Sequence, residues 1–219
     1  MIADFWYKLG RVAARIMLPT FGRVEITGVE NVPLTGAVVV AANHQSNADP
    51  ALMVLAMRRP LWFMAKRGIF RSFPVNYLLR KLHAFPVDRD GRDVDAVRWA
   101  LEQLKQDRMV LIFPEATRRP GGLGKGTDGL TYLAARSRAT VVPVGITGTE
   151  RIKGFGRVAF PFCHMQVRIG EPFHLRAIDG RIPHEALSAM TDTVMERIAV
   201  LLPPEYRGVY ADRVTTPAP

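Results

Sequence analysis

Apolar residues recur along the chain in two patterns, and these patterns alternate. Short apolar runs rich in β-branched residues are typical of buried strands, whereas a repeat of three to four residues is typical of amphipathic helices. Strands are predicted at residues 23–27, 37–40, 60–66, 85–89, 109–113 and 140–146, with an edge strand or hairpin within 158–169. Helices are predicted at residues 51–57, 92–106, 130–137 and 184–202. The alternation indicates an α/β fold built on a doubly wound sheet.

The first segment, residues 2–18, has the period of an amphipathic helix, which we expect Pro19 to end. Its apolar stripe comprises Ile2, Phe5, Trp6, Leu9, Val12, Ala13, Ile16 and Met17. The charged residues recur on the opposite face, and they are Asp4, Lys8, Arg11 and Arg15. A basic face beside an apolar face with aromatic residues suits a helix that lies in a membrane interface. A helix packed on the protein's own core needs the same stripe, so both interpretations stay open.

Length and charge narrow the class of protein. With 219 residues, 48% of them hydrophobic, the chain can form one domain with a buried core. We expect a single domain over residues 1–219, with residues 1–20 as an N-terminal interface helix and 204–219 as a loosely held tail. The formal net charge of +10 predicts an anionic partner, such as nucleic acid, a membrane surface or an acidic substrate. No apolar run approaches the ~20 residues that span a bilayer, and charged residues interrupt any secretory signal at the N-terminus.

Residues 50–87 contain no Asp or Glu. Basic residues are interleaved there with aromatic ones. The basic residues are Arg58, Arg59, Lys66, Arg67, Arg71, Arg80 and Lys81. The aromatic residues are Trp62, Phe63, Phe70, Phe73 and Tyr77. An ordinary solvated surface mixes both signs of charge. Basic and aromatic residues together suit lipid headgroups or stacked nucleobases, and we favour lipid because no nucleic-acid-binding module is recognisable.

The candidate chemistry centres on residues 41–50, which connect a predicted strand to a predicted helix. A carboxylate such as Asp49 can hold a nearby imidazole such as His44 in one tautomer and stabilise it when it takes a proton, which makes a general base. Asp49 is also a good N-cap, followed by Pro50 at the first helical position, and that role needs no catalysis. No motif of a nucleophilic serine is evident, so the hydroxyl that loses the proton can belong to the substrate.

Other polar side chains follow other predicted strands, and they are Lys66, Arg89 and the cluster around Glu115 and Arg118. In open α/β sheets, reacting groups gather at the carboxyl ends of strands, so we expect these residues to share one site. The glycine-rich loop at residues 121–129 lacks the spacing of a nucleotide-binding P-loop.

Four segments carry a resemblance to a known family, and in chain order they are Asn43-His44-x4-Asp49, Phe85-Pro86-Val87-Asp88-Arg89, Phe113-Pro114-Glu115-Ala116-Thr117-Arg118 and Val142-Pro143-Val144-Gly145. Together they resemble the four ordered blocks of the glycerolipid acyltransferase family. Within it, the chain is most similar to the bacterial 1-acylglycerol-3-phosphate acyltransferases, the lysophosphatidic acid acyltransferases. One block is weakly specific, but four in order at these spacings are strongly specific.

The resemblance implies a mixed, mostly parallel sheet flanked by helices. It also implies transfer of a fatty acyl group from acyl-CoA or acyl carrier protein to the free hydroxyl of lysophosphatidic acid, which gives phosphatidic acid in phospholipid biosynthesis. His44 would deprotonate that hydroxyl and Asp49 would orient the imidazole, without an acyl-enzyme. The resemblance implies no metal and no cofactor beyond the thioester co-substrate.

The resemblance further implies that the acceptor's glycerol phosphate is bound by Arg89, Glu115, Thr117 and Arg118. Lys66, which follows a predicted strand, is a further candidate phosphate ligand. The planar fork of an arginine suits phosphate. A glutamate cannot bind phosphate directly, so Glu115 is expected to align an arginine or a hydroxyl. The alternative for Arg89 and Arg118 is a surface ion pair with Asp88 or Asp90.

One residue departs from the family's pattern, because the third block usually carries glycine where this chain has Ala116. If that position requires a positive φ, alanine is strained there. The change affects the expected acceptor more than the expected acyl transfer.

Charge and resemblance together predict a peripheral protein on the cytoplasmic face of the cell membrane, bound to anionic phospholipids and not to nucleic acid. The alternatives are an acyltransferase for another lysolipid, an amino-acid lipid or a glycolipid, and a non-catalytic basic protein that binds membranes or nucleic acid. A metal hydrolase with His44 and Asp49 as ligands is disfavoured, because no second His or Cys stands at zinc-like spacing.

Overall fold

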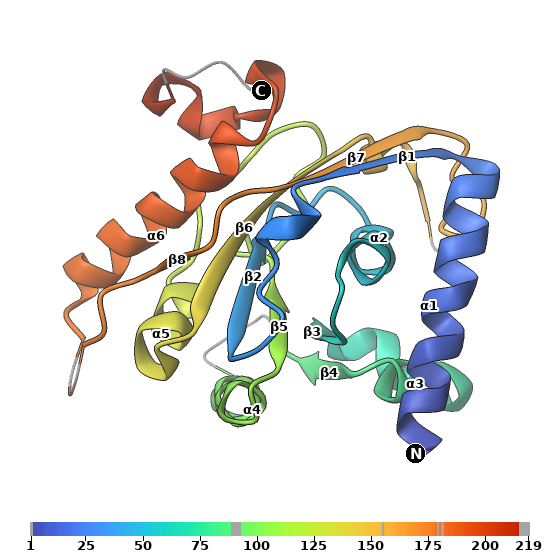
Figure 1. Cartoon of the computed structure of the whole chain (residues 1–219), viewed down its shortest axis with the longest axis horizontal. Helices are drawn as coiled ribbons and strands as arrows, with labels where there is room; N and C mark the ends of the chain where they lie inside the picture. The colour runs from blue at the N-terminus through green and yellow to red at the C-terminus, as the bar shows by residue number, and fades with distance from the viewer. Residues whose placement is uncertain (1, 89–92, 155, 179, 181, 215–219) are drawn as a thin grey trace.

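The computed structural model describes residues 2–88, 93–154, 156–178, 180 and 182–214 (Figure 1). Within these ranges the chain forms an eight-stranded sheet of order β1-β7-β6-β2-β5-β3-β4, with β8 also paired to β6. The strands are β1 Arg23–Thr27, β2 Val38–Ala42, β3 Leu61–Lys66, β4 Ala84–Val87, β5 Met109–Ile112, β6 Thr140–Thr147, β7 His164–Ile169 and β8 Phe173–His174. Five of the seven strand pairings are parallel, and the two antiparallel ones join β6 to β7 and β6 to β8. The predicted α/β fold with a mixed, mostly parallel sheet is confirmed.

Helices cover both faces of the sheet, and they are α1 Ile2–Phe21, α2 Asp49–Ala56, α3 Phe73–Lys81, α4 Val94–Lys105, α5 Gly129–Ser137 and α6 His184–Val200. Helices α1, α2 and α3 lie on one side, and α4, α5 and α6 on the other (Figure 1). The alternation along β2 reflects these two layers, since Val38 and Val40 belong to the first core and Val39 and Ala41 to the second. Every residue of β2 is 0% exposed, as expected for a strand buried on both faces.

The position of β2 determines where the site lies. The strand is central, parallel to β5 on one side and to β6 on the other. The carboxyl ends of these three strands therefore lie at the same edge of the sheet. The segments that follow them begin at Asn43, Phe113 and Gly148, so three loops distant in sequence meet at this edge.

Helix α1 continues through Pro19 to Phe21, so the prediction that Pro19 ends the helix is wrong. The proline falls in the last turn, where its missing N–H interrupts one bond, and the Thr20 hydroxyl donates to the Ile16 carbonyl at 2.6 Å. The helix packs on the core through a face that the predicted stripe does not include. On that face, the buried Tyr7 hydroxyl accepts the Leu61 N–H at 2.9 Å.

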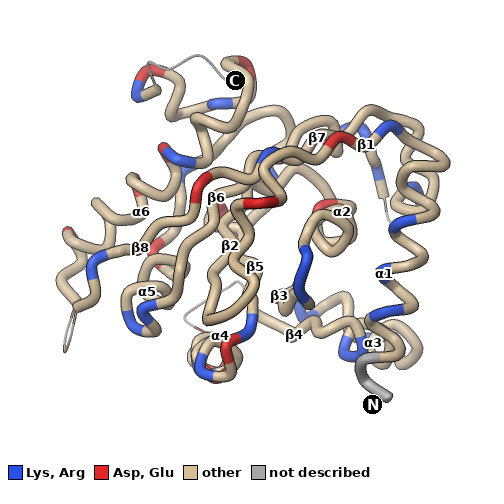
Figure 2. The backbone as a smooth tube through the Cα atoms, in the orientation of Figure 1, with Lys and Arg blue, Asp and Glu red and all other residues tan. Residues whose placement is uncertain are grey.

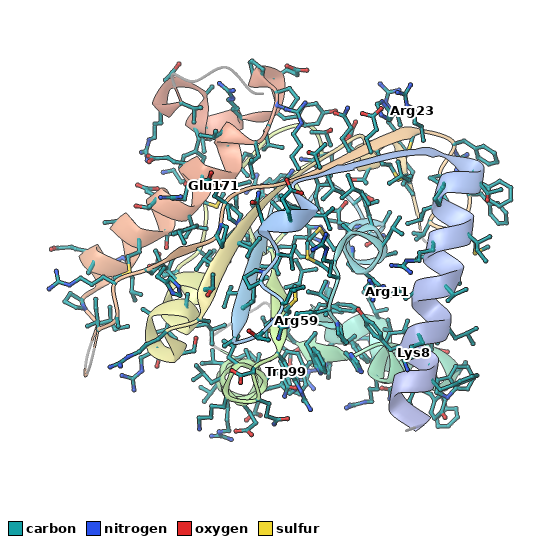
Figure 3. All side chains as sticks on the ribbon, in the orientation of Figure 1. Lys8, Arg11, Arg23, Arg59, Trp99 and Glu171 are labelled. Carbon is teal, nitrogen blue, oxygen red and sulfur yellow. The ribbon has the colours of Figure 1, made fainter. Side chains whose placement is uncertain are left out.

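Much of the predicted apolar stripe of α1 faces solvent, because Phe5, Leu9, Val12 and Ile16 are 59%, 48%, 51% and 61% exposed. Trp6 and Met17 of the same stripe are half-buried. Every charged residue in the part of α1 beyond Asp4 is basic (Figure 2). Arg11, expected on the solvated face, instead points toward α2 (Figure 3), where its Nη2 donates to the Met57 carbonyl at 2.6 Å. In the part of the chain that the structure describes, no helix combines the length and hydropathy needed to cross a membrane.

Two further expectations are corrected near the C-terminus. Strand β7 is not at an edge of the sheet, because it pairs with both β1 and β6. Residues 204–214 are not loosely held, since they form two 3₁₀ segments, Pro204–Tyr206 and Gly208–Arg213. The Leu123 N–H donates to the Tyr206 carbonyl at 2.9 Å, and Tyr210 is 2% exposed. Residues 215–219 of the predicted tail lie outside the described residues.

Candidate functional site

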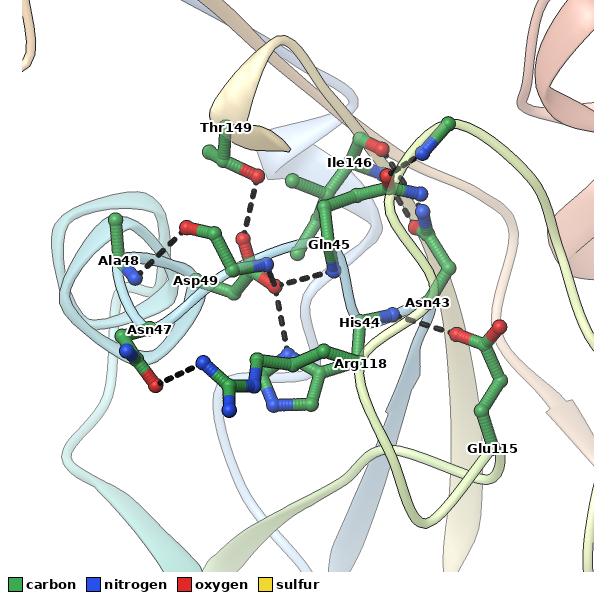
Figure 4. Close-up of polar contacts among 12 residues, drawn as sticks. Asn43, His44, Gln45, Asn47, Ala48, Asp49, Glu115, Arg118, Ile146 and Thr149 are labelled. Carbon is green, nitrogen blue, oxygen red and sulfur yellow. Dashed lines mark hydrogen bonds and ion pairs between the residues drawn. The ribbon is translucent and has the colours of Figure 1, made fainter. Parts of the chain in front are cut away.

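His44 and Asp49 are joined through their side chains at the carboxyl end of β2. The Nδ1 atom of His44 lies 2.7 Å from Oδ2 of Asp49 (Figure 4). Asp49 is 0% exposed and His44 is 6% exposed. Because a carboxylate only accepts hydrogen bonds, it places the imidazole proton on Nδ1 and leaves the lone pair of Nε2 available. This is the arrangement of a general base with an orienting carboxylate.

The carboxylate of Asp49 is fixed by four donors. Besides His44, its Oδ2 accepts the backbone N–H groups of Gln45 and Ser46 at 2.7 and 2.8 Å. Its Oδ1 accepts the hydroxyl of Thr149, which follows β6, at 2.6 Å. Asp49 is also the first residue of α2, and Ala48 occupies the N-cap position. The N-cap interpretation is therefore wrong, since this side chain serves the His44 loop and not the N–H groups of α2.

The loop after β5 holds the main chain and the ring of His44. The Glu115 Oε2 atom accepts the backbone N–H of His44 at 2.7 Å, and the His44 carbonyl accepts the backbone N–H of Arg119 at 2.7 Å. The imidazole stacks on the ring of Phe113, with centroids 4.0 Å apart and planes 15° apart. These contacts fix the ring from a second strand, so the orientation of Nε2 does not depend on Asp49 alone.

Glu115 connects two segments of the site through backbone groups. Its Oε1 accepts the Gly124 N–H at 2.8 Å, while Oε2 accepts the His44 N–H. Burial raises the pKa of this carboxyl to about 7, against the two N–H donors and the Arg119 guanidinium, which lower it. Both carboxyl oxygens are thus engaged by the main chain, and not by the arginine or hydroxyl that the sequence leads us to expect.

Two amide side chains brace the loop around His44. Asn43 makes two bonds to Ile146 of β6, donating to its carbonyl at 2.9 Å and accepting its N–H at 2.7 Å. The Oε1 atom of Gln45 accepts the N–H of Gly121 at 2.6 Å (Figure 4). Sequence reasoning missed Gln45 and Thr149 as site residues. The available signal was that both are polar and closely follow buried strands.

Arg118 and Thr117 lie at the solvent-facing side of the loop after β5, the loop that carries Glu115. The Nη1 atom of Arg118 donates to Oδ1 of Asn47 at 3.0 Å, so the guanidinium reaches the loop that carries His44 (Figure 4). Thr117 is exposed beside it. Asp88, the described candidate partner, instead forms an ion pair of 2.5 Å with Arg67. The surface ion pair considered for Arg118 is therefore not formed with Asp88.

Of the two remaining predicted phosphate ligands, Lys66 and Arg89, the structure describes only Lys66. Lys66 is the exposed last residue of β3, which is separated from β2 by β5. Its position is on the same edge of the sheet as His44, because β2, β5 and β3 are parallel. Arg89 and Asp90 lie outside the described residues. The structure thus brings His44, Asp49 and Glu115 into direct contact and leaves the cations around them exposed.

The conditional prediction for Ala116 is met, since this residue has a φ of 54°. An L-residue in this left-handed region costs about 1–2 kcal/mol, which glycine avoids. The strained residue stands directly between Glu115 and Thr117. Alanine therefore keeps the backbone shape of the loop at an energetic cost.

A metal site has no support among the described side chains, where no three His, Cys, Asp or Glu residues are grouped to hold an ion. At the site, Nδ1 of His44 faces Asp49, and the carboxyl oxygens of Asp49 and Glu115 accept hydrogen bonds from the protein.

Comparisons with known proteins agree with this geometry. A model of the family described as Acyltransferase matches residues 23–147. The chain is 30% identical to the 1-acyl-sn-glycerol-3-phosphate acyltransferase of Bacillus subtilis over 196 residues, 89% of this chain and 96% of that protein. It is 31% identical to the chloroplastic 1-acyl-sn-glycerol-3-phosphate acyltransferase LPAT1 of Arabidopsis thaliana over 78% of this chain and 49% of that protein. The crystal structure of the acyltransferase PlsC from Thermotoga maritima superposes with a TM-score of 0.65 at 28% identity, covering 88% of this chain and 76% of that one.

Proposed function

The chain belongs to the acyltransferase family, and from this premise we propose that it acylates the free hydroxyl of lysophosphatidic acid to give phosphatidic acid. The donor is the thioester of acyl-CoA or of acyl carrier protein. The relatives named as 1-acyl-sn-glycerol-3-phosphate acyltransferases and the Thermotoga maritima structure support this activity over the other family substrates. The structural observation that carries the proposal is the 2.7 Å contact between His44 and Asp49.

The reaction is a direct transfer in which His44 moves the proton. The Nε2 atom takes the proton of the acceptor hydroxyl as its oxygen attacks the thioester carbonyl, and Asp49 stabilises the imidazolium that forms. A carbon–oxygen bond forms and the carbon–sulfur bond breaks. The departing thiolate then takes the proton from His44, which restores the neutral imidazole. General-base help of this kind contributes roughly a hundred- to ten-thousand-fold in rate.

The phosphate of the acceptor is bound by cations at the same edge of the sheet. Arg118 presents a planar fork beside the His44 loop, and Lys66 adds a point charge at the end of β3. Thr117 supplies a hydroxyl, and Arg89 remains a proposed ligand from its place in the second block. Glu115 supports this site by fixing the main chain of His44.

The outer face of α1 attaches the enzyme to the surface of the membrane. Phe5, Leu9, Val12 and Ile16 form an exposed apolar stripe, and the exposed Lys8 and Arg15 lie along one side of it. A helix with this distribution lies in the plane of a bilayer, with its cations among anionic headgroups. The lysolipid is itself a membrane component, so this attachment brings enzyme and acceptor together.

The test is thiol release from acyl-CoA in the presence of lysophosphatidic acid, with the lipid product identified by mass spectrometry. We expect the wild type to form phosphatidic acid and His44→Ala to lose nearly all activity, because the base is absent while the scaffold remains. His174→Ala is the matched control, since that histidine is exposed on β8, where its Nε2 lies 3.5 Å from the Thr140 hydroxyl. If the wild type released no more thiol than His44→Ala and formed no phosphatidic acid, the interpretation as a non-catalytic binding protein would be supported instead.

A panel of acceptors and donors separates the remaining alternatives. Product formed from another lysolipid, an amino-acid lipid or a glycolipid, but not from lysophosphatidic acid, would move the proposal to that acceptor. Acyl-CoA and acyl carrier protein offered separately identify the donor. Activity that a strong chelator abolishes would favour the metal-dependent alternative.

A further inference from the structure

A short loop before β7 exposes two aromatic rings to solvent. We name residues 156–162 the aromatic loop. Within it, Phe160 is 42% exposed and Phe162 is 66% exposed. Both rings contact Phe21, the last residue of α1, with centroids 4.7 and 5.9 Å away. The loop thus extends an exposed apolar surface beyond the C-terminal end of α1.

The backbone of the aromatic loop is strained at the more exposed ring. Phe162 has a φ of 45°, in the left-handed region that costs a non-glycine residue about 1–2 kcal/mol. Its N–H donates to the Phe21 carbonyl at 2.7 Å, which satisfies an acceptor at the end of α1. A glycine would make the same bond without strain. The strain thus opposes the stability that the ring gains from its contacts with Phe21 and Arg157, and Phe162 still stays 66% exposed.

Cations accompany the two rings. The guanidinium of Arg157 lies 5.6 Å from the centroid of the Phe162 ring, and Arg157 is exposed. Arg151 and Lys153, closely preceding the loop, are also exposed. Aromatic rings beside exposed cations complement the surface of an anionic bilayer, where rings enter the headgroup region and cations meet phosphates.

We propose that the aromatic loop is a second membrane-contacting element, which inserts Phe160 and Phe162 into the interface of an anionic phospholipid bilayer. Its apolar surface is continuous with α1 through Phe21. The loop is also close in sequence to Thr149, whose hydroxyl holds Asp49 at 2.6 Å. Insertion therefore places the catalytic edge of the sheet next to the lipid surface.

This inference goes beyond the proposed activity, because it assigns a contact to a segment that takes no part in acyl transfer. It adds a second point of attachment to the one proposed for α1. One helix lying on a surface can rotate about its own axis. A second contact beyond its end limits that rotation and sets the direction in which the site faces.

Phe162→Gly is the sharpest variant, because it removes the exposed ring and relieves the backbone strain. We expect the thermal midpoint to change little, because relief of the strain offsets the lost ring contacts, while binding to vesicles of phosphatidylglycerol and phosphatidylcholine weakens about ten-fold. The matched control is Leu34→Gly, which removes a side chain that is 67% exposed in the loop before the amino end of β2. Binding by Phe162→Gly equal to that of the wild type would overturn the proposal.

A fluorescent label reports contact directly and keeps this test separate from catalysis. Cys163 is the single cysteine, so Cys163→Ser/Phe160→Cys accepts an environment-sensitive dye only at the aromatic loop. We expect its emission to shift to the blue with the same vesicles, and the dye on Cys163→Ser/Leu34→Cys to stay unshifted. An unshifted dye at position 160 would refute insertion of the loop, whatever the acyl-transfer assay shows. Failure of the proposed function would instead appear as wild-type protein that binds vesicles but forms no phosphatidic acid.

Discussion

The Oε2 atom of Glu115 accepts the backbone N–H of His44 at 2.7 Å, so a carboxyl from the β5 loop holds the main chain of the proposed base. The carboxyl is 5% exposed, and burial raises its pKa to about 7. Glu115 therefore connects the pH of the solution to the geometry at His44. The connection acts through backbone atoms and not through the imidazole itself.

The first prediction concerns the pH dependence of stability. A carboxyl whose pKa is raised from 4.5 to about 7 by folding stabilises the fold most when protonated, below pH 4.5, and this contribution is lost as the pH rises through about 7. The loss amounts to up to about 3 kcal/mol. Glu115→Gln should remove this dependence and add a constant penalty, because its amide nitrogen cannot accept an N–H.

Denaturant unfolding at several pH values between 4.5 and 7 measures the effect. Glu102→Gln, an exposed carboxyl on α4, is the control and should keep the slope of the wild type. Parallel pH profiles for the wild type and Glu115→Gln would contradict the shifted pKa.

The second prediction concerns Thr149, a positioning residue that donates its hydroxyl to Oδ1 of Asp49 at 2.6 Å. Thr149→Val keeps the shape but removes a hydrogen bond to a charged group, so we expect kcat to fall about ten-fold. The KM for the acceptor should change little, because Thr149 does not bind substrate. Thr149→Ser restores the hydroxyl and should restore kcat. A purely structural role would instead leave kcat unchanged in the folded fraction of both variants.

Much of the fold could be predicted from the sequence, because its strands are short and buried. The run at residues 37–40 predicted β2 well, since a strand covered on both faces is apolar throughout. The sequence did not reveal that α1 packs on the core through Tyr7 and Leu18. An amphipathic stripe has the same pattern whether it is covered by the protein's own core or by lipid. It also did not place β7 inside the sheet. Strand order depends on long-range pairing, which a local pattern does not encode.

The candidate site could be predicted only in part. The spacing of His44 and Asp49 across a strand-to-helix turn was enough to pair them. The role of Glu115 was missed because its partners are backbone N–H groups, which every residue carries and no side-chain pattern reports. Thr149 was missed for a related reason. Its contact with Asp49 spans 100 residues and depends on β6 lying next to β2.

The third prediction concerns the strained Ala116, which has a φ of 54°. Ala116→Gly relieves the strain, and after the greater flexibility of the unfolded chain is allowed for, we expect a gain of up to about 1 kcal/mol. Ala13→Gly is the matched control, because Ala13 is an exposed helical residue and should lose about 1 kcal/mol. Opposite shifts in thermal midpoint check both. A loss of stability in Ala116→Gly would show that the conformation is not strained.

The fourth prediction concerns Arg118, whose guanidinium donates to Asn47 at 3.0 Å. If Arg118 binds the acceptor phosphate, Arg118→Ala should raise the KM for lysophosphatidic acid and change kcat little, because it removes ground-state binding. Asn47→Ala removes the same hydrogen bond and leaves the cation in place. Steady-state kinetics of both variants separate the two roles. An equal effect of the two substitutions would indicate that Arg118 only supports the loop.

The fifth prediction contrasts the two faces of α1. Leu9→Ser/Ile16→Ser acts on side chains that are 48% and 61% exposed, so it should weaken binding to anionic vesicles at least ten-fold and leave the thermal midpoint unchanged. Tyr7→Phe acts on the inner face, where it removes the acceptor of the Leu61 N–H. That variant should lower stability by about 1–3 kcal/mol and keep vesicle binding, because a buried donor loses its partner.

Deleting residues 1–18 would be a less informative experiment, since it also uncovers core that Tyr7 and Leu18 now bury. Co-sedimentation with vesicles and thermal unfolding of the two substituted proteins distinguish the faces without that complication. If the outer face packed on the protein and did not contact lipid, Leu9→Ser/Ile16→Ser would change the thermal midpoint and leave vesicle binding unchanged. An interfacial helix requires that Leu9→Ser/Ile16→Ser weakens vesicle binding alone and that Tyr7→Phe lowers stability alone. The inner face of such a helix packs on the fold, and its outer face contacts the lipid.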